Sequence, residues 1–174
     1  MTSQEFKNTI LIKSPHYANS RIPLIQLLAN KGSKKSEYSQ FGPIYELYIY
    51  AFMLGIKKNL RLPLPPRSLT TEFAKIGTWK RDSSLVDFLL MIVFTRSEEI
   101  GFEWNDLEEM EDAELNSVIS KIIVFIEEYA NGGLEYLHGL LDKGELENSH
   151  YMFIDLYKEN LQDTISKSVK QNRL

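Results

Sequence analysis

The 174-residue chain contains no cysteine, and this absence excludes several kinds of site at once. Disulfide bonds, thiolate nucleophiles and cysteine-based zinc sites all require a thiol group. A chain without cysteine also suits a reducing compartment, so we expect a cytoplasmic protein. Histidine is scarce too. The chain has His16, His138 and His150 in unrelated contexts, which argues against a histidine-based site.

Long apolar runs and nucleotide-binding motifs are also missing. The longest nearly apolar run, residues 85–94, is interrupted by Asp87 and is too short to cross a bilayer. Residues 1–9, MTSQEFKNT, lack the basic start and the apolar core of a secretion signal. No glycine-rich phosphate loop and no GxSxG nucleophile turn occurs. We therefore expect a protein with no membrane partner and no cofactor.

The chain has enough apolar residues for one sizeable core, since 43% of it is hydrophobic and 11% is aromatic. Apolar residues recur at helical spacing in residues 44–54, 118–141 and 149–168. The sequence predicts a mainly α-helical fold: a compact, multi-helix single domain over residues 1–174 with a short N-terminal extended segment. Residues 149–168 are predicted to form an amphipathic C-terminal helix.

Other patterns mark the shorter segments. Apolar and polar residues alternate in TILIK, residues 9–13, so residues 1–19 are predicted to form an N-terminal arm or a short strand. Three prolines make residues 60–68 an extended connector, because proline removes a donor and restricts the residue before it. We also expect a helix from a Ser20 cap to about residue 30, and a helical turn within residues 70–77.

Residues 85–94, after a cap at Asp82 or Ser83, are apolar nearly all round, so we expect a central buried helix there. Asp87 within it then needs a basic partner from the first half of the chain, such as Arg61 or Arg81. Trp79 precedes two cations, and we interpret it as a core or interface anchor in preference to a platform that stacks on a base.

The stretch from residue 122 to residue 141 carries two apolar helical faces that meet at Asn131-Gly132-Gly133. Glycine adopts the left-handed conformation that commonly ends a helix. We therefore predict a helix stop at Gly132 that folds the following residues back onto the core.

Charge is divided unevenly along the chain. Residues 1–81 hold 13 Lys and Arg against 4 Asp and Glu, and residues 82–174 hold 7 against 20, so the halves carry +9 and -13. Such asymmetry is typical of a protein with an anionic partner for its basic half. The alternative is that the two halves face each other within one domain and attract.

The basic half supplies the candidate residues for binding DNA or an acidic partner. They are Lys34, Lys35, Lys57, Lys58, Arg61, Lys80 and Arg81. If DNA is the partner, these side chains are expected to form one positive surface. For the lysine-rich loop at residues 31–42, solvation alone is the alternative interpretation.

Carboxylates dominate residues 97–116, where they interleave with aromatic residues. This acidic segment is predicted either to dock on a basic partner or to be a solvated loop. Further along, Glu127 and Glu128, with Glu135 and an acid of the C-terminal helix, are candidates for a magnesium cluster. Adjacent helical residues point about 100° apart, however, so a plain polar helix face is the favoured interpretation.

Two segments carry a family resemblance. Residues 124–135 read VFIEEYANGGLE, and residues 48–64 read YIYAFMLGIKKNLRLPL. Over about residues 41–141 the chain resembles small bacterial proteins encoded beside DNA phosphorothioation (Dnd) genes. The motif residues of that resemblance are Glu127, Glu128, Tyr129, Asn131, Gly132 and Gly133. The resemblance implies a setting in DNA modification or defence, and it assigns no reaction and no metal to these residues.

These observations together predict a non-enzymatic accessory or adaptor protein of a bacterial DNA-modification or restriction system for phage defence. Its basic N-terminal half would bind DNA or another protein of the complex, and homo-oligomer formation stays open. One alternative is a carboxylate- and magnesium-dependent nuclease subunit, in which Glu127 or Glu128 converges with another acid. The other is a structural subunit that docks through the acidic segment, residues 97–116.

Overall fold

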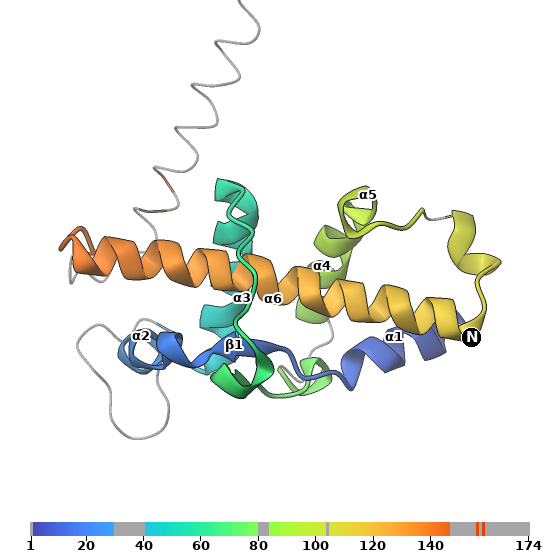
Figure 1. The fold of residues 1–174 in the computed structure, drawn as a ribbon, viewed down its shortest axis with the longest axis horizontal. Helices are drawn as coiled ribbons and strands as arrows, with labels where there is room; N and C mark the ends of the chain where they lie inside the picture. Colours follow the sequence, from blue (N-terminus) through green and yellow to red (C-terminus); the bar gives the residue numbers. More distant parts are fainter. Residues whose placement is uncertain are drawn as a thin grey trace, which may run out of the picture.

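One long helix, α6 (Asp112–Asp142), forms the axis of the structure, and the other elements pack along it (Figure 1). The computed structural model describes residues 2–29, 41–79, 84–103, 105–146, 156 and 158. At a rise of 1.5 Å per residue, the 31 residues of α6 span about 45 Å. Glu111 and Glu114 form a capping box at its first turn, where negative charge also complements the helix dipole.

The other elements are shorter and precede α6 in the chain. In order they are α1 (Ser3–Leu11), β1 (His16–Ala18), η1 (Asn19–Arg21), α2 (Ile22–Leu28), α3 (Ile44–Lys58), η2 (Arg67–Leu69), β2 (Thr70–Glu72), η3 (Ile76–Thr78), α4 (Ser84–Phe94), α5 (Ser97–Ile100) and η4 (Asn105–Glu108). Helices dominate, and the two strands form one small sheet, so the predicted mainly α-helical single domain is confirmed. None of the helices in the described ranges has both the length and the apolarity that crossing a membrane requires.

The two strands join the N-terminal part of the chain to the segment that follows α3. They pair antiparallel, with His16 opposite Glu72 and Ala18 opposite Thr70. The N–H of Phe73 extends the ladder by donating to the carbonyl of Pro15 at 2.8 Å. An isolated pair this short is marginal in water, so its stability depends on the helices that it packs against.

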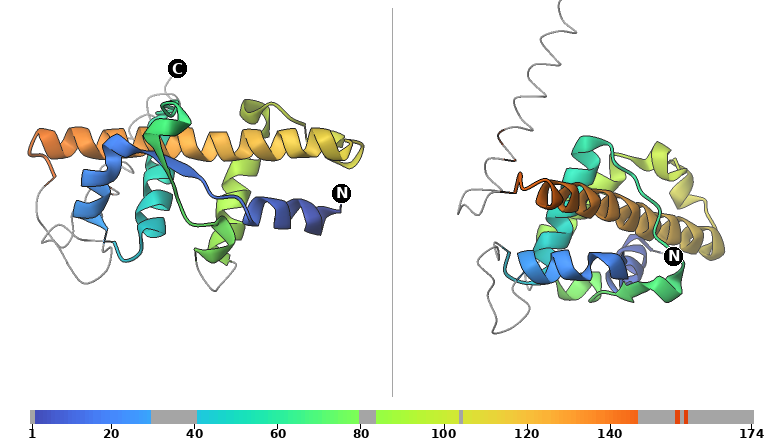
Figure 2. Two further views of the ribbon diagram at one scale, coloured as in Figure 1. Left: turned by 60° about the horizontal axis from the view of Figure 1, so that its bottom comes forward. Right: turned by 60° about the vertical axis from the view of Figure 1, so that its left-hand side comes forward.

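Helix α3 crosses α6 at a steep angle, and glycine lets the two backbones touch (Figure 2). A Cβ atom on Gly133 would lie 1.8 Å from the carbonyl oxygen of Ala51, and one on Gly55 would lie 2.0 Å from that of Tyr129. Two nonbonded heavy atoms cannot approach that closely, so only glycine fits at these positions without a shift of the helices.

The chain that leaves α3 then crosses the opposite side of α6 (Figure 1). Asn59 adopts a left-handed conformation with φ 53°, which turns the chain out of the helix. Residues 60–66, called the crossing segment here, are extended, and Leu62 N–H donates to the carbonyl of Glu128 at 3.1 Å. A Cβ atom on Gly132 would lie 1.9 Å from the carbonyl oxygen of Leu60. Helix α6 is therefore held between α3 and the crossing segment.

Aromatic side chains fill the space around this crossing. Phe52 of α3 packs edge-to-face on Phe125 and Tyr129 of α6, with ring centroids 6.3 and 6.5 Å apart. Trp79 is 1% exposed, and its Nε1–H donates to the carbonyl of Ala74 at 2.8 Å. The prediction that Trp79 is a core anchor is confirmed.

The prediction of an extended segment at residues 9–13 is wrong, because α1 continues to Leu11. Thr2 and Glu5 form a capping box at the start of α1, and Ile10 is completely buried against the core. Apolar residues in so short a run fit one face of a helix as well as one face of a strand. The extended N-terminal segment begins later, at β1.

Two smaller elements also differ from their predictions. Ser20 lies within η1 and makes no capping hydrogen bond to α2, which begins at Ile22 with Pro23 in its first turn. Residues 70–72 form β2 and not a helical turn, because pairing with β1 satisfies their backbone groups. The helical turn starts only at Ile76.

Helix α4 is not the central buried helix that the sequence predicts, because α6 occupies that position. Phe88 and Met91 of α4 are 46% and 55% exposed. Asp87 is also exposed, and its carboxylate pairs with Lys7 of α1 at 2.5 Å and not with Arg61. One apolar face of α4 is therefore left exposed by the residues that the structure describes.

Asn131-Gly132-Gly133 does not interrupt α6, so the predicted helix stop is wrong. The helix runs through these residues to Asp142, and neither glycine has a positive φ. The left-handed glycine lies beyond the end of α6, at Gly144 with φ 68°. Gly132 and Gly133 are required for close approach and not for a turn.

Several predicted features lie outside the described residues. They are most of the lysine-rich loop at 31–42, with Lys34 and Lys35, then Lys80 and Arg81, and the C-terminal helix at 149–168 apart from Leu156 and Lys158. Leu156 is 9% exposed and belongs to the hydrophobic core.

We expect Gly133→Ala to lower the free energy of unfolding by about 2–3 kcal/mol, because its methyl group would push α6 off the Ala51 carbonyl. Gly139→Ala on the same helix is the matched control, since no atom lies within 4 Å of its Cβ position. That change should raise the free energy of unfolding by roughly 0.5–1 kcal/mol through helix propensity. Urea unfolding measures both, and equal midpoints would contradict the assigned contact.

Candidate functional site

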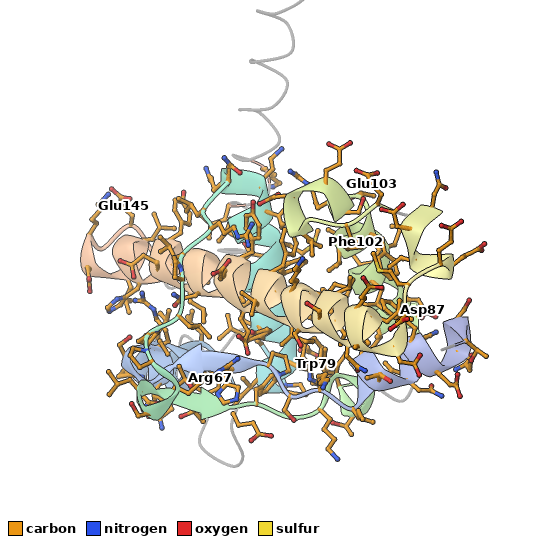
Figure 3. The ribbon with its side chains drawn as sticks, turned by 45° about the vertical axis from the view of Figure 1, so that its right-hand side comes forward. Arg67, Trp79, Asp87, Phe102, Glu103 and Glu145 are labelled. Atoms are coloured by element: carbon orange, nitrogen blue, oxygen red, sulfur yellow. The ribbon has the colours of Figure 1, made fainter. Side chains whose placement is uncertain are left out.

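The residues of the EEYANGGLE sequence lie at the middle of α6, where the first half of the chain folds across it. We refer to Glu127–Glu135 as the α6 motif. Five elements of the first half reach it: α3, the crossing segment, β1, η1 and η2. Figure 3 shows Arg67 on the side of α6 that faces β1. The polar contacts of this region define the candidate site.

Glu127 is a buried carboxylate, 3% exposed, with partners from two elements. Arg67 of η2 donates to both of its oxygens, from Nη1 at 2.9 Å and from Nη2 at 3.1 Å. The backbone N–H of His16 donates to Oε1 at 2.8 Å. Tyr48 donates to the carbonyl of His16, and burial, with the nearby charge of Glu127, holds the pKa of Tyr48 well above its ordinary value. The buried charge is thus paired and hydrogen-bonded, as stability requires.

Glu128 and Tyr129 belong to a second cluster, which includes Glu99 near the start of the acidic segment. Arg61 donates from Nε to Glu128 at 2.6 Å and from Nη1 to Glu99 at 3.3 Å, and its guanidinium lies 5.5 Å from the centroid of Phe125. Tyr129 O–H donates to the same Glu99 carboxylate at 2.6 Å. Burial and this carboxylate raise the pKa of Tyr129 to about 12, so its hydroxyl stays protonated.

Asn131 fixes the crossing segment to α6. Its amide nitrogen donates to the carbonyls of Leu62 and Pro63, at 3.2 and 3.1 Å. Those carbonyls lie in an extended stretch that has no strand partner in the described structure, and Asn131 is only 6% exposed. The buried Asn131 amide therefore has two backbone partners, and it ties the crossing segment to α6.

Arg21 of η1 binds the last part of the α6 motif. Its Nε lies 3.5 Å from the Asn131 amide oxygen, its Nη2 pairs with Glu135, and its Nη1 lies 3.4 Å from His138 Nδ1. The Arg21 side chain is 13% exposed, so this guanidinium is largely enclosed by its partners. His138 Nε2 in turn lies 3.7 Å from Asp142.

The charge division seen in the sequence is thus partly neutralised inside the fold. Four basic residues of the first half pair with acids of the second half: Lys7 with Asp87, Arg21 with Glu135, Arg61 with Glu128 and Glu99, and Arg67 with Glu127. These pairs support the interpretation that the two halves face and attract each other.

The predicted binding residues are only partly brought together. Lys57 and Lys58 end α3, and Arg61 follows within the next turn of chain, so these three cations share one region. Lys58 Nζ lies 5.1 Å from the centroid of the Tyr136 ring, and Arg61 is engaged with Glu128 and Glu99. Lys34, Lys35, Lys80 and Arg81 lie outside the described residues, so their position relative to this region stays a prediction.

The two glutamates of the magnesium hypothesis point apart. Glu127 faces Arg67 and Glu128 faces Arg61, as expected for neighbours on a helix. Within the described ranges, no group of three or more His, Asp and Glu side chains is placed to hold a metal ion. The carboxylates of the α6 motif thus bind guanidinium groups of their own chain.

Sequence reasoning found the α6 motif but missed its partners. Arg21, Arg67 and Glu99 lie between 30 and 114 residues away in sequence from the side chains that they bind. No local spacing marks a pair that tertiary folding brings together. The opposite charges of the two halves predict that the halves attract each other, but they do not identify the individual pairs.

Comparison with known proteins gives one match. A protein-family model described as DNA sulphur modification system-associated protein 4 matches residues 17–173. The matched range contains the whole α6 motif and its partners on η1, η2 and the crossing segment, whereas α1 precedes it. No curated protein and no solved structure matches the chain.

We expect Arg67→Ala to lower the free energy of unfolding by about 2 kcal/mol, because it leaves the buried Glu127 carboxylate without its cation. The loss is kept moderate by the 57% exposure of Arg67, which lets water approach. Arg96→Ala, which removes an exposed pair with Glu99, is the control and should cost less than about 0.5 kcal/mol. Urea unfolding compares the two, and equal losses would contradict a special role for the Glu127 pair.

Because Tyr129 donates a hydrogen bond to Glu99, we expect the folded protein to lose stability at alkaline pH. The pKa of this phenol is about 12 in the folded chain, against an ordinary value of 10.0. The unfolded state releases the proton first, so the stabilisation is complete below pH 10 and is lost as pH rises from there through about 12. Unfolding free energy measured across this window should fall less steeply for Tyr129→Phe than for the unaltered chain. Parallel curves would show that Tyr129 does not contribute.

Proposed function

The chain belongs to the family of DNA sulphur modification system-associated protein 4, and on that premise we propose that it is a non-enzymatic accessory protein of such a system. In this role it is an adaptor that binds another protein of the modification or defence complex. Its contact region is the basic one formed by the end of α3, with Lys57 and Lys58, together with the predicted basic residues Lys34, Lys35, Lys80 and Arg81.

The observation that carries this proposal is the use of the α6 motif within the fold. Glu127, Glu128, Tyr129 and Asn131 all bind side chains or backbone groups of their own chain. A catalytic carboxylate needs room for a metal ion, a water molecule or a substrate proton, and these carboxylates are instead occupied by arginines. We therefore infer that the α6 motif stabilises the fold, and that partner binding is a property of the protein surface.

A protein partner is favoured over DNA because four of the thirteen basic residues of the first half already pair with carboxylates of the same chain. Arg21, Arg61 and Arg67 are bound to carboxylates, and DNA affinity depends on the number of phosphates that free cations neutralise. A protein partner needs fewer cations, since a small set of well-placed side chains carries most of the energy of an interface.

We expect Lys57→Glu with Lys58→Glu to weaken binding to a co-expressed protein of the sulphur-modification system by about tenfold or more. The readout is the amount of that protein retained on the tagged chain. The control is Lys75→Glu with Lys143→Glu, the same charge change at exposed positions of another region, which should leave retention unchanged. Loss in both variants, or in neither, would contradict the assigned surface.

Two results would change the assigned role itself. Binding of the purified chain to duplex DNA, with affinity that falls steeply as salt rises, would make DNA the partner. Magnesium-dependent cleavage of that DNA, abolished by Glu128→Ala, would overturn the non-enzymatic role. The unfolding of Glu128→Ala must be measured alongside, because this change also removes the partner of Arg61.

A further inference from the structure

The crossing segment, residues 60–66, is an apolar stretch that lies outside the core. Six of its seven residues are leucine or proline, yet none of the seven is buried. Nor does any of them belong to the hydrophobic core or to the apolar side chains packed against it. In Figure 1 the segment runs across the outer side of α6, where no described element covers it. Apolar residues that a core does not use indicate contact with another molecule.

The conformation of this segment is that of a polyproline II helix. A proline ring holds φ at about −65° and biases the residue before it towards extended conformations. Three prolines therefore restrict the whole stretch from Leu62 to Pro66. Pro66 itself has φ −49° and ψ 146°, close to polyproline II values. The Asn131 side chain and the Glu128 carbonyl also hold the stretch on α6, so a partner meets it already ordered.

One edge of the segment faces α6. A polyproline II helix repeats about every three residues, so residues three apart in sequence share an edge. Arg61 and Arg67 lie on the same edge by this rule, and both pair with glutamates of the α6 motif. Leu64 lies between them on that edge. The two arginines that flank the prolines are therefore bound to their own chain.

The other two edges present paired apolar side chains to solvent. Pro63 and Pro66 form one edge, and both are exposed. Leu62 and Pro65 form the other edge, and both are half-buried. The segment thus carries two apolar dipeptides, Leu62-Pro63 and Pro65-Pro66, one turn of the helix apart. Ligands with this spacing of prolines dock in grooves lined by aromatic side chains.

Hydrogen bonding selects that kind of groove over other partner surfaces. Proline lacks an N–H group, so the segment cannot pair along its length with a strand of a partner. The carbonyls of Leu64 and Pro65 accept no hydrogen bond from the described residues, which leaves them to a donor of the partner. Tyr and Trp meet both needs, because each packs an apolar ring and donates a hydrogen bond from its polar end.

We propose that the dipeptides Leu62-Pro63 and Pro65-Pro66 dock in a groove lined by Tyr and Trp on another protein of the sulphur-modification system. A second copy of the chain does not match this chemistry with its large apolar groove between α1, α4 and the start of α6, which is lined by neither Tyr nor Trp. The proposal rests on the adaptor role and gives the chemical class of the partner's surface. Lys57 and Lys58 end α3 directly before the segment, so the two contact regions adjoin.

The test measures binding of the full-length chain to each purified protein of the system in turn. Pro63→Ala with Pro66→Ala should weaken binding to the partner by about tenfold or more, because these changes remove the rings that enter the groove. Pro23→Ala with Pro43→Ala is the matched control, since it makes the same change at two exposed prolines at the starts of α2 and α3. It should leave binding unchanged. All four prolines are exposed, so both variants should fold, and thermal unfolding checks this.

A second measurement identifies the surface on the partner. The partner is labelled with fluorotryptophan and fluorotyrosine and the chain is left unlabelled, so fluorine resonances report the aromatic side chains of the partner alone. Several of these resonances should shift when the unaltered chain is added. They should shift much less at the same concentration of the Pro63→Ala and Pro66→Ala variant. Resonances that keep their positions while the complex forms would overturn the aromatic groove.

Comparison with Lys57→Glu and Lys58→Glu separates this proposal from the basic contact region. Full binding by the proline variant, with loss in the lysine variant, would overturn docking of the crossing segment and leave the basic region in place. Loss in the proline variant with full binding by the lysine variant would support the crossing segment and contradict the basic region. A chain that binds none of the proteins of the system would overturn both.

Discussion

The contact on which the structure depends is the backbone-to-backbone crossing of α3 and α6. Gly55 and Gly133 allow each helix to approach a carbonyl of the other, and Gly132 does the same for the crossing segment. At these glycines no side chain separates the two backbones, so the contact cannot adjust by a change of side-chain conformation. The crossing therefore fixes the position of α6, and with it the direction in which each residue of the α6 motif points.

Charge pairs then hold the first half of the chain on α6. Glu127 accepts from Arg67 at 2.9 Å and Glu128 accepts from Arg61 at 2.6 Å, with the carboxylates more enclosed than the guanidinium groups. Such pairs add little net stability compared with an apolar core, but a wrong arrangement would leave a carboxylate unpaired. The arginines thus select one register of η1, η2 and the crossing segment on α6 over its alternatives.

Composition and helical spacing predict the fold class and most of the helices, because burial of an apolar face is a local pattern. The predicted stop at Gly132 fails for a physical reason: a turn with positive φ and a close helix crossing both demand glycine, and the sequence does not distinguish them. Asp87 pairs with a basic residue of the first half, as the sequence predicts, but that residue is Lys7 of α1. An apolar run does not tell a buried helix from α4, in which Phe88 and Met91 are exposed. The α6 motif could be found from its resemblance, but its partners Arg21 and Arg67 could not, since only tertiary folding brings them near.

The position of α6 in the chain also sets the order of events during synthesis. Every element that α6 organises is made before it, so the first half leaves the ribosome without the surface that it packs on. When residue 81 has just been made, Phe52 and Gly55 lack the helix that they pack on, and the nascent segment carries the +9 charge of residues 1–81. Folding must wait for contacts that join residues about 70 to 110 positions apart, which slows it relative to a bundle of sequential hairpins. By the time α6 begins, residues 82–111 have added 9 Asp and Glu against 1 Arg, so residues 1–111 carry a net charge of only +1. Self-repulsion of the basic half is therefore largely cancelled before the helix that completes the core is made.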